Sequence, residues 1–335
     1  MPSSPSRTGN ALFRPLALTS LFCLISTPAI QANDTVFSNL PDKKTEISIN
    51  KKVVVVTGRI SAGYLIGEAD ELVYWPAGSD TQLSELNWTM ENVFMVGAGI
   101  TVQPSSWLKF NADISVAANE GSNEMDDFDW MYTTTDWSHW SHHTDVDLTK
   151  GSIFDINAEL TFFRYHETSF SGLLGYKRDN WEWEARGGEY IYSVNGFRDS
   201  IGSFEDDLGI TYEQTFDVPY MGLAFQADLS PVFLSGRFIA STFYSATGKD
   251  THHLRDLYFE DEFNNGTMIS FDLASAYHFT DHIALMGKYQ FTKYYTAHGD
   301  TTTTDYSTGE VTVTNGIAGI GNQTSLFSLS FLYMF

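Results

Sequence analysis

The stretch that decides the fold closes the chain, where residues 327–335 read Phe-Ser-Leu-Ser-Phe-Leu-Tyr-Met-Phe. Every second side chain, from Phe327 to Phe335, is large and apolar or aromatic. In a β-strand such alternate side chains share one face, and a strand of a membrane barrel needs an apolar face toward the lipid. An aromatic last residue is also common in outer-membrane barrels. The pattern therefore favours a transmembrane barrel over the last strand of a soluble sandwich.

Further strand candidates recur along the chain at steady intervals. They cover residues 53–74, 86–100, 106–118, 152–166, 168–186, 208–228, 231–246, 265–280 and 282–298, and with 319–335 they number ten. Short polar turns join some of them, and long segments join others, at 119–150, 187–207, 247–264 and 299–318. The sequence predicts an all-β fold, a ten-stranded antiparallel transmembrane β-barrel with long extracellular loops. Several candidates exceed the roughly 9–11 residues that cross a bilayer, so we expect the barrel to project beyond it.

Residues 1–32 have the pattern of a secretory signal peptide. Arg7 and Arg14 give a basic start, residues 16–25 are apolar but too few to span a bilayer, and Ala32 is a small residue suited to cleavage. A buried N-terminal helix is the alternative interpretation.

Residues 33–335 are then expected to form a single barrel domain. The only cysteine, Cys23, lies inside the predicted signal, which leaves no disulfide framework and no Cys-based zinc site. The signal is followed by no run of about 18 apolar residues, the length that a transmembrane helix needs. A closed barrel is the other structure that satisfies its backbone groups within a bilayer.

The formal net charge is −23 at pH 7. Such a charge argues against nucleic acid as a partner, because phosphate binding needs clustered Lys and Arg. An acidic cleft would instead raise the local concentration of cationic peptides or proteins. A well-solvated acidic surface with no such partner would have the same composition.

Two pairs of residues carry candidate chemistry. Asp127 and Asp129 lie two residues apart, so an extended segment points both the same way. Two close carboxylates can bind metal, take a proton or orient a water, although acidic loops also contain this pattern by chance. Asp250 and His252 have the same spacing, and a carboxylate beside an imidazole makes the histidine a better general base.

Three histidines, His139, His142 and His143, lie within five residues and raise the question of a metal site. Their spacing matches no zinc-binding motif, and a polar loop rim is the favoured interpretation. We therefore expect no metal and no cofactor.

Several segments occur in a distinctive order: Glu71–Tyr74 with Leu86–Trp88, Met125–Met131, Ala185–Ser193 followed by Gly196–Asp199 and Ile201–Phe204, Pro219–Leu223 and Asp250–His252. Together these segments resemble the omptin family of outer-membrane proteases, and the similarity spans roughly residues 55–335. The resemblance implies a barrel in the outer membrane of a Gram-negative bacterium, with an active site in an outward-facing groove.

The resemblance also implies roles for the two pairs. A water held between His252 and Asp127 would attack the scissile carbonyl, His252 would take its proton, Asp250 would orient the imidazole, and Asp129 would support Asp127. A serine route through Ser141 is the rival mechanism.

Substrate preference carries over from the resemblance only in part. Glu71 matches a carboxylate at the floor of the pocket for a basic residue before the cut, and Met125 and Ile210 match its apolar walls. Gly248 stands where a second pocket aspartate would be expected, and His139 stands where an acid often serves the residue after the cut. We therefore expect cleavage after a basic residue, with a weaker discrimination against other residues at that position.

Family members also hold lipopolysaccharide on the barrel exterior, where it acts as an activator. Tyr176 matches one position of that site, whereas Arg178, Asn180 and Thr215 depart from the pattern. Outer-membrane lipid is thus an expected partner with a partly matched site, and we expect a monomer.

The principal alternative function is a non-enzymatic barrel that acts as an adhesin or a channel. Such a barrel would keep the alternation at 327–335 but would not need the two residue pairs. A lipase or acyltransferase is a third possibility, but it should place its nucleophile near the membrane surface.

Overall fold

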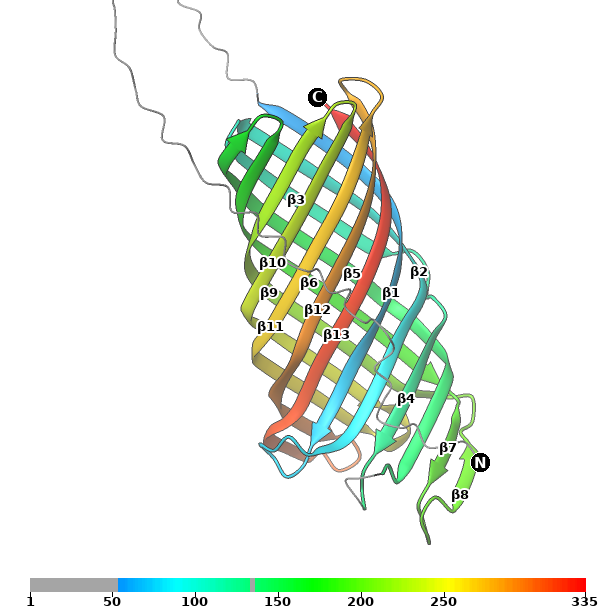
Figure 1. The fold of residues 1–335 in the computed structure, drawn as a ribbon. Helices are drawn as coiled ribbons and strands as arrows, with labels where there is room; N and C mark the ends of the chain where they lie inside the picture. Colours follow the sequence, from blue (N-terminus) through cyan, green and yellow to red (C-terminus); the bar gives the residue numbers. More distant parts are fainter. Residues whose placement is uncertain (1–53, 133–135) are drawn as a thin grey trace, which may run out of the picture. The chain divides into compact units, whose positions relative to one another are not determined.

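The computed structural model describes residues 54–132 and 136–335, and within them the chain is almost entirely β-strand (Figure 1). The predicted signal peptide, residues 1–32, lies outside the described residues. The strands are β1 (Val55–Tyr74), β2 (Gln82–Ser105), β3 (Leu108–Ala117), β4 (Asn123–Asp129), β5 (His139–Tyr165), β6 (Thr168–Arg186), β7 (Glu189–Tyr192), β8 (Ser200–Ser203), β9 (Leu208–Leu229), β10 (Val232–His252), β11 (Leu257–His278), β12 (Ile283–Asp305) and β13 (Val311–Met334). A single 3-10 turn, η1 (His253–Arg255), joins β10 to β11.

The strands close into a ring. Each long strand pairs antiparallel with its neighbours, β1 pairs with β13, and β3 pairs with both β2 and β5. β3 and β4 share one place in the ring, because β4 also pairs with β2 and β5. The short strands β7 and β8 form a hairpin that extends the edge of β5. The predicted antiparallel barrel with ten strands around the ring is confirmed.

The long connecting segments are mostly strand rather than loop. β4 and the first part of β5 lie within 119–150, and the end of β10 and the start of β11 lie within 247–264. The pairing of β10 with β11 continues up to His252 and Leu257. The sequence hid these extensions because a strand that leaves the lipid faces water, so its outward side chains need not be apolar. The candidate catalytic residues therefore lie on strands.

An apolar belt covers the outside of the barrel near the short turns. From Phe327 to Phe335, every second side chain is exposed, whereas Ser330 is buried between them. Large exposed side chains such as Phe94, Leu174 and Leu223 extend the belt around the ring. In residues 54–132 and 136–335, no helix has the length and hydropathy to cross a membrane.

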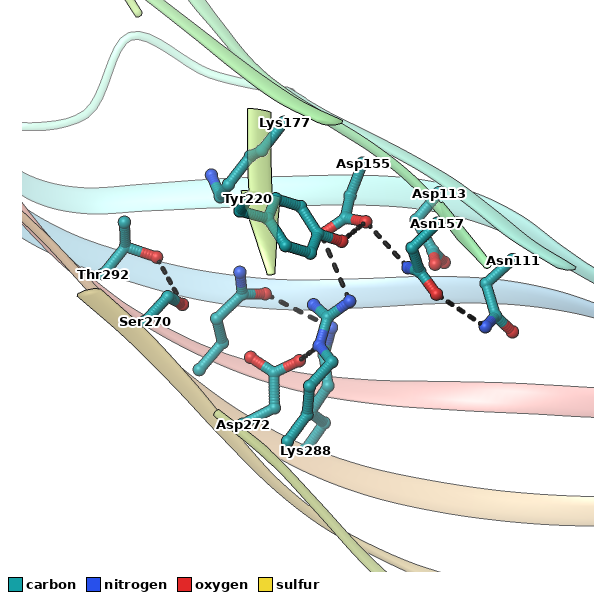
Figure 2. A network of polar contacts seen from close by, with 12 residues as sticks. Asn111, Asp113, Asp155, Asn157, Lys177, Tyr220, Ser270, Asp272, Lys288 and Thr292 are labelled. Atoms are coloured by element: carbon teal, nitrogen blue, oxygen red, sulfur yellow. Dashed lines mark hydrogen bonds and ion pairs between the residues drawn. The ribbon is translucent and has the colours of Figure 1, made fainter. Parts of the chain in front are cut away.

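The lumen inside this belt is filled by a polar network (Figure 2). The Arg237 guanidinium donates to Asp272 at 2.7 Å and forms an ion pair with Asp155 at 3.2 Å. Asp155 also accepts hydrogen bonds from Tyr220 and Asn157, at 2.7 and 2.9 Å. Because buried charges are tolerated when they are paired and hydrogen-bonded, these ion pairs allow charged side chains to occupy the lumen.

An aromatic core lies farther along the barrel, away from Phe335. The Trp88 ring stacks on Tyr212 with 5.6 Å between ring centroids and lies 5.9 Å from Trp183. All three side chains are buried, and Met125 packs among them. This core forms a rigid floor beneath the open end of the barrel.

Gly266 provides a test of how tightly the interior is packed. The Tyr244 ring lies directly over it, so a methyl group added at Gly266 would meet that ring at 1.9 Å, and the Tyr244 hydroxyl is held by the Tyr295 carbonyl at 2.8 Å. We predict that Gly266→Ala lowers the stability of the refolded barrel by about 1–3 kcal/mol, the usual cost of overpacking. The measurement is the temperature at which the folded band is lost on unboiled gels.

Gly287→Ala is the matched control, because nothing lies within 4 Å of a methyl group at that position. Equal unfolding temperatures for the two alanine variants would contradict the proposed contact.

Candidate active site

A cavity of about 480 Å³ opens above the aromatic core, at the end of the barrel opposite Phe335 (Figure 1). Its lining comes from β1, β2, β4, β5, β7 and β9 to β13, together with η1. The lining includes Glu71, Asp127, Asp129, Asp250, His252 and Asp261. The site therefore lies outside the apolar belt and gathers acidic groups that are far apart in the sequence.

Asp127 and Asp129 both face the cavity from β4, as their spacing on an extended segment predicts. Burial and the charge of Asp129 raise the pKa of Asp127 well above its ordinary value, while Arg255 acts in the opposite direction. Burial also raises the pKa of Asp129. The pair therefore retains a proton at a higher pH than two separate surface carboxylates would.

Asp250 and His252 face the same cavity from β10. The His252 Nε2 atom lies 2.5 Å from Oδ2 of the buried Asp250. The other ring nitrogen, Nδ1, lies 2.5 Å from Nη2 of Arg255. A guanidinium can only donate, so Nδ1 accepts this hydrogen bond and Nε2 carries the proton that is donated to Asp250. Nδ1 is thus the nitrogen with a lone pair available for base chemistry.

The two pairs approach each other across the cavity. Arg255 lines the same cavity, contacts His252 and opposes the rise in the pKa of both Asp127 and Asp129, so its charge acts on both pairs. His252 also acts electrostatically on Asp129. β4 and β10 are not neighbours in the ring, so only closure of the barrel brings these groups together.

The matched pocket residues have different positions. Glu71 lies on β1 at 5% exposure and lines the cavity, and Ile210 lines it from β9. Met125 does not line the cavity, because it is completely buried in the aromatic core beside Trp88. Burial, followed by the charges of Asp250, Asp261 and Asp127, raises the pKa of Glu71 well above its ordinary value.

Two further residues in the cavity were missed by the sequence analysis. Asp261 lies on β11 directly across from Gly248, and burial raises its pKa to about 7. Arg255 lies in η1, beside His252. Both fall in the segment 247–264 that was interpreted as a loop. The alternation of Phe259, Asp261 and Phe263 was the available signal for a strand with an inward acid.

The three clustered histidines point in different directions. His142 contacts Asp126 at 3.0 Å, His143 stacks on Phe204, and His139 contacts Ser138 at 3.0 Å. Among the described residues, no three His, Cys, Asp or Glu side chains gather closely enough to hold a metal ion.

Ser141 and His143 form a second pair in the cavity. The buried Ser141 Oγ lies 3.2 Å from His143 Nε2, and both residues line the cavity. Burial lowers the pKa of His143, and its Nδ1 has no side-chain carboxylate partner among the described residues. The pair has the first contact of a nucleophilic dyad but lacks an acid to orient the imidazole.

The predicted lipid-binding position lies on the outside of β6. The Tyr176 hydroxyl donates to Asp217 on β9, and Arg178 forms an ion pair with the same carboxylate at 3.4 Å. Asn180 donates to the Thr215 hydroxyl at 2.8 Å. Within the described residues, these groups thus satisfy one another across the two strands.

Comparisons with known proteins agree with this architecture. The model of the omptin family matches residues 52–335. The plasminogen activator of Yersinia pestis is 27% identical over 278 residues, which cover 82% of this chain and 88% of that protein. The outer membrane protease OmpP of Escherichia coli is 27% identical over 284 residues, or 84% of this chain and 90% of the relative.

Among solved structures, the crystal structure of the outer membrane protease OmpT from Escherichia coli has the same fold. It matches with a TM-score of 0.80 at 24% identity, covering 84% of this chain and 97% of that chain.

A closed antiparallel barrel with an apolar belt and an acidic cavity at one end defines an outer-membrane β-barrel hydrolase. The chain belongs to the omptin family. It is therefore a protease of the Gram-negative outer membrane.

The raised pKa of Glu71 makes stability depend on pH. The ordinary pKa is 4.5, so between that value and its higher folded pKa the folded state keeps a proton that the unfolded state has lost. The free energy of unfolding therefore falls as pH rises above 4.5. We predict that Glu71→Gln raises the unfolding temperature relative to the natural protein, by an increment that grows from pH 4.5 toward neutrality.

Glu310→Gln is the control, because Glu310 is exposed. The measurement is thermal unfolding in detergent micelles at a series of pH values. An increment that stays constant with pH would show that Glu71 ionises normally.

Proposed function

We infer that this protein is an endopeptidase that cleaves cationic proteins or peptides after a basic residue, with its site facing outward. The observation that carries the proposal is the convergence of the Asp250–His252 pair and the Asp127–Asp129 pair on one cavity. These groups can activate a water, and no covalent intermediate is needed.

The proposed reaction begins with a water between His252 and Asp127. Nδ1 of His252 removes a proton as the water oxygen bonds to the scissile carbonyl carbon, and Asp250 stabilises the imidazolium through Nε2. Asp127, supported by Asp129, accepts a hydrogen bond from the second hydrogen of the water and so orients it. His252 then returns its proton to the amide nitrogen as the carbon–nitrogen bond breaks.

Arg255 must withdraw before this reaction can start. Its guanidinium donates to the nitrogen that has to receive the water's proton. A cationic substrate that enters between the acidic walls would compete with Arg255 for the same carboxylates, so substrate binding and release of the base are coupled.

The polarity of the cavity supports a cationic substrate. Glu71 provides a buried carboxylate at its floor and Ile210 an apolar wall. A barrel that served only as an adhesin would have no need for this arrangement, although adhesion is compatible with it as a second activity. Lipopolysaccharide as an activator that contacts Tyr176, and a monomeric state, are further parts of the proposal.

Asp127→Ala and His252→Ala test the mechanism. Each should lower the cleavage of a fluorogenic peptide with a central arginine by at least about 1000-fold, because each removes a group that acts on the water. Folding is checked by gel mobility before and after boiling.

Asp126→Asn is the matched control, because Asp126 lies on the same strand but contacts Trp140 and His142 instead of the cavity acids. Full activity in both alanine variants would exclude the proposed water activation.

The Ser141–His143 contact calls for a separate test. We predict that Ser141→Ala keeps cleavage within about 10-fold of the natural protein, since losing a true nucleophile costs several orders of magnitude more. The measurement is kcat on the same peptide. A loss as large as that of His252→Ala would favour the serine route instead.

A further inference from the structure

The cavity contains two buried carboxylates that serve neither catalytic pair. Asp250 holds His252, and Asp127 lies with Asp129. Glu71 and Asp261 remain, at 5% and 6% exposure, and each has one oxygen that finds no hydrogen-bond partner within the described residues. The charge of Asp261 raises the cost of ionising Glu71.

The strand register places Asp261 in front of Gly248. The two residues are direct partners between β11 and β10, and directly opposed side chains share a face. A methyl group built on Gly248 would lie 3.4 Å from Oδ2 of Asp261. The carboxylate of Asp261 thus reaches the space that a side chain at 248 would occupy, where the family resemblance leads one to expect an aspartate.

Among the residues that the structure describes, no cation neutralises this pair. In residues 54–132 and 136–335, neither Glu71 nor Asp261 forms an ion pair with Lys, Arg or His. Buried carboxylates without a partner are costly, and the raised pKa of each shows that cost. A positive side chain entering the cavity would supply the partner that both lack.

We propose that Asp261 joins Glu71 in a two-carboxylate pocket for the basic side chain before the scissile bond, so that β11 supplies the charge absent at Gly248. The inference rests on the proposed function. It replaces the expectation that glycine at position 248 weakens the preference for a basic residue before the cut. A guanidinium can donate to two carboxylates at once, whereas an ammonium acts as a point charge. The pocket therefore prefers arginine to lysine.

The first experiment compares two peptides that differ only in having arginine or citrulline before the cut. Citrulline has nearly the shape of arginine but no charge. Asp261→Asn should lower kcat/KM for the arginine peptide by about 10- to 100-fold, the effect of losing a hydrogen bond to a charged group, and leave the citrulline peptide nearly unchanged. Glu260→Gln, one residue away and on the other face of β11, is the matched control.

The second experiment transfers the carboxylate from position 261 on β11 to position 248 on β10. The double variant Gly248→Asp with Asp261→Ser should recover at least part of the arginine preference that Asp261→Asn loses. A side chain at 248 meets only ordinary contacts, the nearest at 3.4 Å, so there is room for this exchange.

Binding of agmatine, an arginine analogue without a carboxylate, separates this inference from the proposed function. Its Kd, followed by tryptophan fluorescence, should be about 10-fold or more weaker in Asp261→Asn. That result supports the pocket even if the natural protein cleaves no peptide. Equal agmatine affinities, or an unchanged ratio of arginine to citrulline cleavage, would overturn the role of Asp261 while leaving the protease proposal intact.

Discussion

The pairing of β1 with β13 is the constraint on which the rest of the structure depends. It closes the ring, so that the backbone groups of the outer strands find partners within the protein, as a bilayer demands. Closure also fixes the register of every ladder, and a shift by one residue would turn each inward side chain outward. Glu71, Asp127, Asp250 and Asp261 face one cavity only because four strands keep their register around the whole ring.

Electrostatic cost and function are linked in this cavity. Burial above the aromatic core around Trp88 raises the pKa of Glu71 and Asp127. A fold stabilised by its lumen network and aromatic core can tolerate this local cost. A cationic group that binds in the cavity would lower this electrostatic cost, and the gain would add to its binding free energy. Arg255 gives partial relief, because its charge acts to lower the pKa of Asp127 and Asp129.

The sequence revealed the fold through residues 327–335, whose alternation matches the exposed and buried positions of β13. The spacing of two residues likewise placed Asp127 beside Asp129 and Asp250 beside His252. Asp261 escaped detection because its relation to Gly248 exists only across a strand pair. Arg255 lies on the short 3-10 turn η1, which the sequence analysis did not predict. Met125 was expected in the pocket wall, but it packs beneath the cavity. Residues 139–150 were taken for loop because their outward side chains meet water instead of lipid.

The polar network around Arg237 affects how a peptide can enter and leave the barrel. Below the cavity, Asp155 and Asp272 bind this guanidinium, and the Tyr220 hydroxyl donates to Asp155 (Figure 2). A peptide that enters the open end meets charged groups that are already paired with one another in the lumen. Passage of a fragment through the barrel would have to break these buried ion pairs, so release through the mouth is the less costly route for both products.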